Sequence, residues 1–105
     1  MNKNAKVSLV KSDKHYDNIS KAIELIVSDL NSIRHKKNIL IKPNLTATKN
    51  VYANTDVKTV ETVIDYLLNK FPELHESRFT ILEGSGSAYY EKVTTSEVFI
   101  NFGYY

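Results

Sequence analysis

The sequence contains no cysteine, which excludes disulfides, iron–sulfur ligation, thiolate zinc sites and cysteine nucleophiles. Its apolar runs are short, so no segment is expected to span a membrane or to bind one. The first residues, Met1-Asn2-Lys3-Asn4, lack the apolar core and the small-residue cleavage site of a signal peptide. The sequence therefore predicts a cytoplasmic chain without membrane contacts.

The chain also lacks a strong excess of charge of one sign. There are 14 basic and 12 acidic side chains, for a formal charge of +2, and no basic run is longer than Lys36-Lys37. Nucleic-acid surfaces usually need a clustered basic stripe, so we predict no nucleic-acid partner. With 105 residues, 42% hydrophobic and 25% charged, residues 1–105 are expected to fold as a single domain around one core.

The pattern of the first half predicts two strands with a helix between them. Residues 5–12 (AKVSLVKS) form a short β-favouring run, and a helical period follows it from Asp17, the expected N-cap, to Ile33. The run Ile39-Leu40-Ile41 is uniformly apolar, which is typical of a strand covered by helices on both faces. Pro43 ends that strand, and a polar loop of about a dozen residues follows, long enough to suggest a functional loop.

The second half predicts a helix, a strand and a last helix. The first helix opens near Thr55 and Asp56 and closes at Pro72. Residues 78–83 (RFTILE) are the third strand, which Gly84-Ser85-Gly86 interrupts. The last helix begins at the capping box of residues 94–97 and ends at Gly103.

This alternation predicts an α/β fold, a three-layer βαβαβα Rossmann-like domain with a small parallel sheet. Three strands are few for such a sheet, since sheets average about five or six strands. The chain is therefore expected either to complete its sheet by forming a homo-oligomer or to be part of a larger fold.

Open parallel sheets bind ligands beyond the carboxyl ends of their strands. In this chain that edge would gather two lysines, an asparagine, a glutamate and a Gly-Ser-Gly turn: Lys11, Lys42, Asn44, Glu83, Gly84, Ser85 and Gly86. Lysines, helix N-termini and a flexible turn together favour an anion such as phosphate or carboxylate. Neither a GxGxxG fingerprint nor a P-loop is present, so no cofactor is predicted.

Several of these residues have an alternative structural role. Lys42 either contacts a ligand or forms an ion pair with Glu83, and Lys11 is either part of the site or simply solvated. Gly84 and Gly86 either touch a ligand or serve a turn. The terminal pair Tyr104-Tyr105 either marks a partner surface or packs beside a helix. The three histidines stand apart in the sequence, so no metal site is predicted.

Six segments together resemble the prokaryotic family called domain of unknown function 362. The similar segments are VSLVKS (7–12), KAIELI (21–26), ILIKPNL (39–45), VETVIDYL (60–67), LEGSG (82–86) and TTSEVFINFGY (94–104). Family members usually continue for another two hundred or so residues, so the resemblance implies that this chain corresponds to their amino-terminal portion. The family has no settled activity, and the resemblance therefore implies a fold more than a function.

Two functions remain open from the sequence. The first is an α/β domain that binds an anionic small molecule at the carboxyl ends of its strands. The second is a self-associating or partner-binding structural module without catalytic activity. Whether the chain is an enzyme is uncertain, because no complete acid/base or nucleophile constellation can be assembled from its residues.

Overall fold

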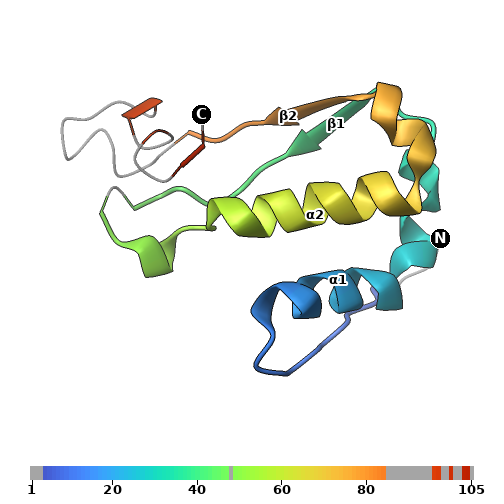
Figure 1. The fold of residues 1–105 in the computed structure, drawn as a ribbon, viewed down its shortest axis with the longest axis horizontal. Coiled ribbons are helices and arrows are strands. Elements are labelled where there is room, and N and C mark those ends of the chain that lie inside the picture. Colours follow the sequence, from blue (N-terminus) through green and yellow to red (C-terminus); the bar gives the residue numbers. More distant parts are fainter. Residues whose placement is uncertain (1–3, 48, 85–95, 98–99, 101–102, 105) are drawn as a thin grey trace.

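The computed structural model describes residues 4–47, 49–84, 96–97, 100 and 103–104. It is a mixed α/β arrangement of helices with a small parallel sheet (Figure 1). In chain order, the elements are α1 (His15–Leu25), the 3₁₀-helix η1 (Val27–Ile33), β1 (Asn38–Ile41), the 3₁₀-helix η2 (Val51–Ala53), α2 (Val57–Lys70), the 3₁₀-helix η3 (Pro72–Glu76) and β2 (Arg78–Ile81).

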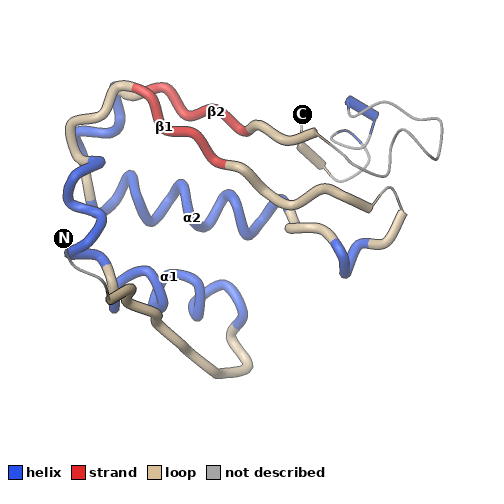
Figure 2. Tube along the Cα trace, turned by 180° about the vertical axis from the view of Figure 1, so that it is seen from behind, coloured by secondary structure: helices blue, strands red, loops and turns tan. Residues whose placement is uncertain are grey.

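The two strands pair in parallel, with α2 as the crossover between them. The register runs from Asn38 opposite Arg78 to Ile41 opposite Ile81. Alternate side chains are half-buried on the face toward α2, and those between them are exposed. Figure 2 shows α2 running along one side of the sheet. The prediction that these two segments are strands of a small parallel sheet is therefore confirmed.

Helix α2 begins and ends where the sequence predicts. The Asp56 carboxylate caps it, because Oδ1 accepts the Thr59 backbone N–H at 2.6 Å. The helix ends at Lys70, Phe71 takes a non-helical conformation, and Pro72 opens η3. The helix buries Val60 and Leu67 on the side that carries the apolar positions of its sequence.

Helix α1 differs from its predicted bounds at both ends. It begins at His15, and Asp17 lies in its first turn instead of at the N-cap. It stops at Leu25, and the chain continues as η1 after a break at Ile26, whose φ and ψ are −121° and 13°. Ile26 and Val27 are β-branched, which lowers the helix propensity at this point.

Among the described residues, the core consists of two apolar clusters that lie along α2. One contains Leu45, Val60 and Tyr104, and the other contains Leu67, Phe71 and Leu74. Side chains from η1 and from both strands pack against the second cluster, so it ties the 3₁₀-helices and the sheet to α2. Leu45, Phe71 and Leu74 are 0% exposed.

The prediction of a first strand at residues 5–12 is wrong. These residues form no strand, and Val7 and Leu9 are 88% and 90% exposed. Polar contacts hold this part of the chain beside α1 and η1 instead: Lys6 pairs with Asp29 at 3.0 Å, and the Asn18 amide donates to the Ser12 carbonyl at 3.1 Å. A β-favouring run forms a strand only where a partner strand is in reach.

The three-layer, Rossmann-like arrangement is likewise not what the described residues form. Their sheet has two strands, and α1 lies on the side of α2 that faces away from the sheet, so both helices are on one side of it (Figures 1 and 2). Leu40 is consequently 62% exposed on the uncovered face, although the apolar run around it predicted cover on both faces. The predicted last helix lies largely outside the described residues; Gly103 has the φ of +86° that a helix-ending glycine adopts.

No helix in the described ranges combines the length and the apolar character needed to cross a membrane.

Candidate functional site

The carboxyl ends of β1 and β2 bring Lys42 and Glu83 together. Lys42 directly follows β1, and the Leu82 N–H continues the ladder by donating to the Ile41 carbonyl at 3.0 Å. Glu83 comes next, and its Oε2 accepts a hydrogen bond from the Lys42 ammonium at 3.0 Å. The ion pair that the sequence left open as an alternative is therefore present. We call the edge around this pair the strand-end site.

The two partners of this ion pair differ sharply in exposure. The Lys42 side chain is 70% exposed, whereas the Glu83 side chain is 7% exposed. The Gly84 N–H donates to Glu83 Oε1 at 2.8 Å, and the Leu45 backbone also hydrogen-bonds to this carboxylate. The Lys42 hydrogen bond, helped by those backbone donors, outweighs desolvation and lowers the pKa of Glu83. Glu83 is thus a fixed anion that orients an exposed cation.

Asn44 lies at the same edge and closes the loop between β1 and α2. Its side-chain amide donates to the Ala53 carbonyl at 2.9 Å, and its backbone N–H donates to Thr55 Oγ1 at 3.0 Å. The Thr55 N–H returns a bond to the Asn44 carbonyl at 2.8 Å. Asn44 therefore shapes the strand-end site by holding the two ends of the loop together.

A second asparagine, Asn54, also holds this loop together through its side chain, and the sequence did not predict this role. The Asn54 side chain accepts from the Ala47 N–H at 3.0 Å and donates to the Ala47 carbonyl at 2.6 Å. Tyr104 adds a contact from the far end of the chain, because its hydroxyl donates to the Thr55 carbonyl at 2.7 Å. Tyr104 is 6% exposed, so it packs in the core, and burial raises its pKa to about 12.

The remaining predicted site residues are only partly gathered here. Gly84 is at the site, but a Cβ added there would meet nothing within 4 Å, so the described structure does not itself require glycine. Ser85 and Gly86 lie outside the described residues. Lys11 is not at the sheet edge, because the segment that carries it runs along the side of α1 that faces away from the sheet (Figure 1). Lys11 was predicted at this edge because residues 5–12 were predicted to form a strand, which they do not.

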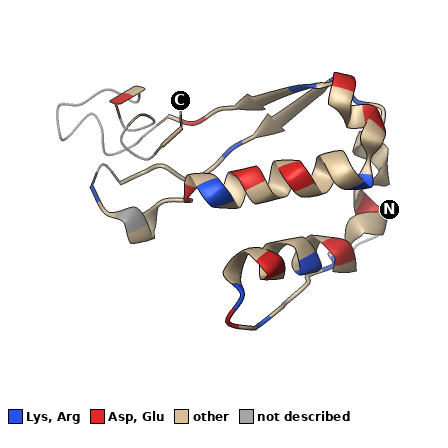
Figure 3. Ribbon diagram, viewed as in Figure 1, with Lys and Arg blue, Asp and Glu red and all other residues tan. Residues whose placement is uncertain are grey.

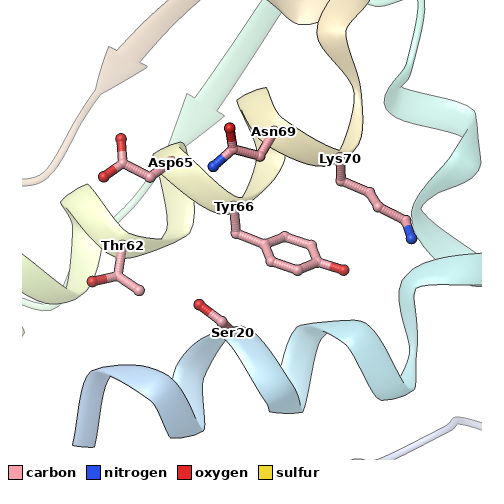
Figure 4. Close-up of a pocket in the computed structure, with 6 residues that line it drawn as sticks. All are labelled: Ser20, Thr62, Asp65, Tyr66, Asn69 and Lys70. Carbon is pink, nitrogen blue, oxygen red and sulfur yellow. The ribbon is translucent and has the colours of Figure 1, made fainter.

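A polar cavity between α1 and α2 is a further feature that the sequence analysis did not find. Its volume is about 410 Å³, and six residues line it: Ser20, Thr62, Asp65, Tyr66, Asn69 and Lys70. Figure 4 shows Tyr66 reaching from α2 toward α1, whereas Asp65 points away from α1. The only signal in the sequence was polar side chains spaced three and four residues apart on α2.

The polar and charged side chains beside this cavity form hydrogen bonds and an ion pair with one another. The Tyr66 hydroxyl donates to Glu24 Oε2, and Lys70 pairs with Glu24 Oε1 at 3.1 Å. Burial and then the hydrogen bond to Glu24 raise the pKa of Tyr66 to about 12, and the same bond is the main reason that the pKa of Glu24 is lowered. This cluster joins α1 to α2, and its polar groups are already used for that purpose.

No group of three His, Asp or Glu side chains that could hold a metal ion occurs within the described part of the chain. Comparisons with models of protein families, with curated proteins and with solved structures found no match to this chain. The resemblance to the domain of unknown function 362 family therefore stays a prediction.

The lowered pKa of Glu83 predicts a pH-dependent contribution to stability. Because folding lowers this pKa, the stabilisation is complete above the ordinary glutamate pKa and is lost as the pH falls through the folded value. We expect Glu83→Gln to lower the melting temperature more at pH 7 than at pH 3. Glu76→Gln, at an exposed position of η3, controls for the loss of one negative charge. A difference that is the same at both pH values would contradict this prediction.

Proposed function

We propose that this chain binds an anionic small molecule, a phosphate or carboxylate compound, at the strand-end site. The observation that carries the proposal is the Lys42 ammonium, which a carboxylate of 7% exposure holds in place while 70% of the lysine side chain stays exposed. A lysine ammonium has three N–H donors, and one of them points to Glu83. The other two have no partner within the described part of the chain, so a ligand can accept hydrogen bonds from them.

The location of Lys42 supports the same proposal. Ligands of parallel α/β proteins bind beyond the carboxyl ends of the strands, and Lys42 directly follows β1 at that edge. Fixing a flexible lysine before the ligand arrives reduces the conformational entropy lost on binding. Glu83 and Asn44 act in this proposal as positioning residues, and the Gly84 N–H, which donates to Glu83, lies at the same edge.

The charges set the expected character of binding. Glu83 offsets part of the attraction between Lys42 and an anion, so we expect modest affinity that weakens as salt concentration rises. An exposed site of this kind favours a small ligand with one or two phosphate or carboxylate groups.

The test is thermal melting of the chain with inorganic phosphate, pyrophosphate, succinate and adenosine monophosphate. A ligand at one hundred times its dissociation constant stabilises the folded state by about 2.7 kcal/mol, which raises the Tm of a domain of this size by several degrees or more. We expect at least one compound to cause such a rise, and the rise to be lost in Lys42→Ala and Lys42→Met.

Each variant is compared with itself without ligand, because removing Lys42 leaves the Glu83 carboxylate without its ion-pair partner and lowers the starting Tm. Lys21→Ala, on the exposed surface of α1, removes the same charge elsewhere and should keep the ligand response. A response that survives in both Lys42 variants would overturn the proposal.

A further inference from the structure

The segment before α1 presents an apolar face that nothing in the described part of the chain covers. We call residues 5–11 the N-terminal segment. Val7 and Leu9 are 88% and 90% exposed, while Ser8 between them and Val10 after them are half-buried. The backbone groups of residues 5–11 form no hydrogen bonds within the described residues. The segment therefore has both the side-chain alternation and the free backbone groups of an unpaired strand.

A matching groove lies beside β2. It is a cavity of about 180 Å³, lined by Ile81 of β2 and by five α2 residues: Val57, Val60, Glu61, Ile64 and Asp65. No β1 residue lines it, so it lies on the side of β2 that faces away from β1. On that side the β2 backbone has no partner strand among the described residues. We call this feature the β2 groove.

The charges of the two surfaces are complementary. Most of the residues that line the β2 groove are apolar. The acidic side chains of Glu61 and Asp65 also line it. In a strand, Val7, Leu9 and Lys11 would point to the same face, because side chains alternate with a period of two. Figure 3 shows basic positions in the chain before α1 and acidic positions along α2. Val7 and Leu9 therefore suit the apolar floor, and Lys11 suits the acidic residues.

We propose that the N-terminal segment of one copy of this chain adds as a third strand to the free edge of β2 in a second copy. Val7 and Leu9 fill the β2 groove, Lys11 pairs with Glu61 or Asp65, and backbone hydrogen bonds continue the sheet. Two copies that exchange their segments reciprocally form a closed dimer. Two-stranded sheets are only marginally stable alone, so the third strand would strengthen each copy.

The position of α1 favours binding of the N-terminal segment to the β2 groove of a second copy over binding to the groove of its own copy. The segment runs on the side of α1 that faces away from the sheet (Figure 1), and Lys6 near its start pairs with Asp29 of η1. Residues 12–14 alone join it to α1, so Lys11 and His15 can be at most roughly 14 Å apart. A single helix with its side chains is about 10 Å across, and both α1 and α2 lie between the segment and the sheet. With α1 packed on α2, the segment therefore lies away from its own β2 edge.

The test is sedimentation velocity of the full chain over a hundredfold range of concentration. We expect a concentration-dependent dimer for the wild-type chain. Leu9→Lys should weaken it on the order of tenfold or more, because a charge replaces a leucine that the interface buries. Leu25→Lys is the matched control, since Leu25 is 66% exposed on α1 and away from the proposed contact. This control should dimerise as the wild-type chain does.

A charge exchange identifies the groove itself. Lys11→Glu should weaken the dimer, and mixing it with the Glu61→Lys/Asp65→Lys variant should restore association as a heterodimer. A wild-type chain that is monomeric throughout would overturn the proposal, as would a dimer that Leu9→Lys leaves unchanged. A monomer whose Tm falls with Leu9→Lys would also overturn it, because its own segment would then occupy the groove. None of these outcomes depends on anion binding at Lys42.

Discussion

Replacing Phe71 by alanine is expected to destabilise the folded chain by about 3–5 kcal/mol, the cost of truncating a fully buried phenylalanine. Phe71 is 0% exposed and lies between α2 and η3, where it packs with Leu67 and Leu74. The Arg34 guanidinium carbon lies 5.2 Å from the centre of its ring. Small domains are stable by about 5–15 kcal/mol in total, so this one substitution removes a large share of that stability.

Urea unfolding followed by circular dichroism measures this effect. We expect a much lower midpoint for Phe71→Ala, or a chain that is already unfolded without urea. Leu25→Ala is the control, because Leu25 is 66% exposed and its truncation should change the free energy of unfolding by no more than about 0.5 kcal/mol. Similar midpoints for the two variants would show that Phe71 is not at the centre of the core.

Leu45→Ala is expected to cost about 2–5 kcal/mol, the second largest effect. Leu45 lies in the loop after β1, yet it is 0% exposed and packs against Val60 and Tyr104. Its backbone also hydrogen-bonds to Glu83. The substitution should therefore loosen the strand-end site as well as the core, and any anion response in thermal melting should weaken with it.

Leu40→Ala is the comparison for this prediction. Leu40 is in the middle of β1, where a sequence reading would place it in the core, but it is 62% exposed. We expect its truncation to have a small effect beside that of Leu45→Ala. Equal losses in urea unfolding would mean that the loop is less buried, or the strand more buried, than the structure shows.

Local signals in the sequence were sufficient for α2 and for the strand pair. Asp56 is a capping residue, Pro72 cannot continue a helix, and the apolar positions between them recur at the helical period. Each of these signals acts within a few residues, so the sequence alone could place the helix. The parallel strands then follow from the crossover, and they bring Lys42 and Glu83 to one edge.

Features that depend on distant partners could not be predicted in this way. Residues 5–12 have a strand pattern, but whether they pair with another strand depends on where α1 packs. The contacts of Glu24 with Tyr66 and Lys70 hold α1 against α2 instead of against the sheet. The exposure of Leu40 follows from the same packing. The burial of Leu45 depends on Tyr104, which is 59 positions further along the chain.

The most direct test of anion binding at the strand-end site is a titration of the ¹⁵N-labelled chain with inorganic phosphate, followed by amide NMR shifts. We expect the amide signals of Lys42, Leu45 and Gly84 to move progressively with phosphate, and those of Leu45 and Gly84 to stay in place in Lys42→Ala. Signals that do not move in the wild-type chain, or that move around Ser20 and Lys70 between the helices instead, would contradict a site at Lys42.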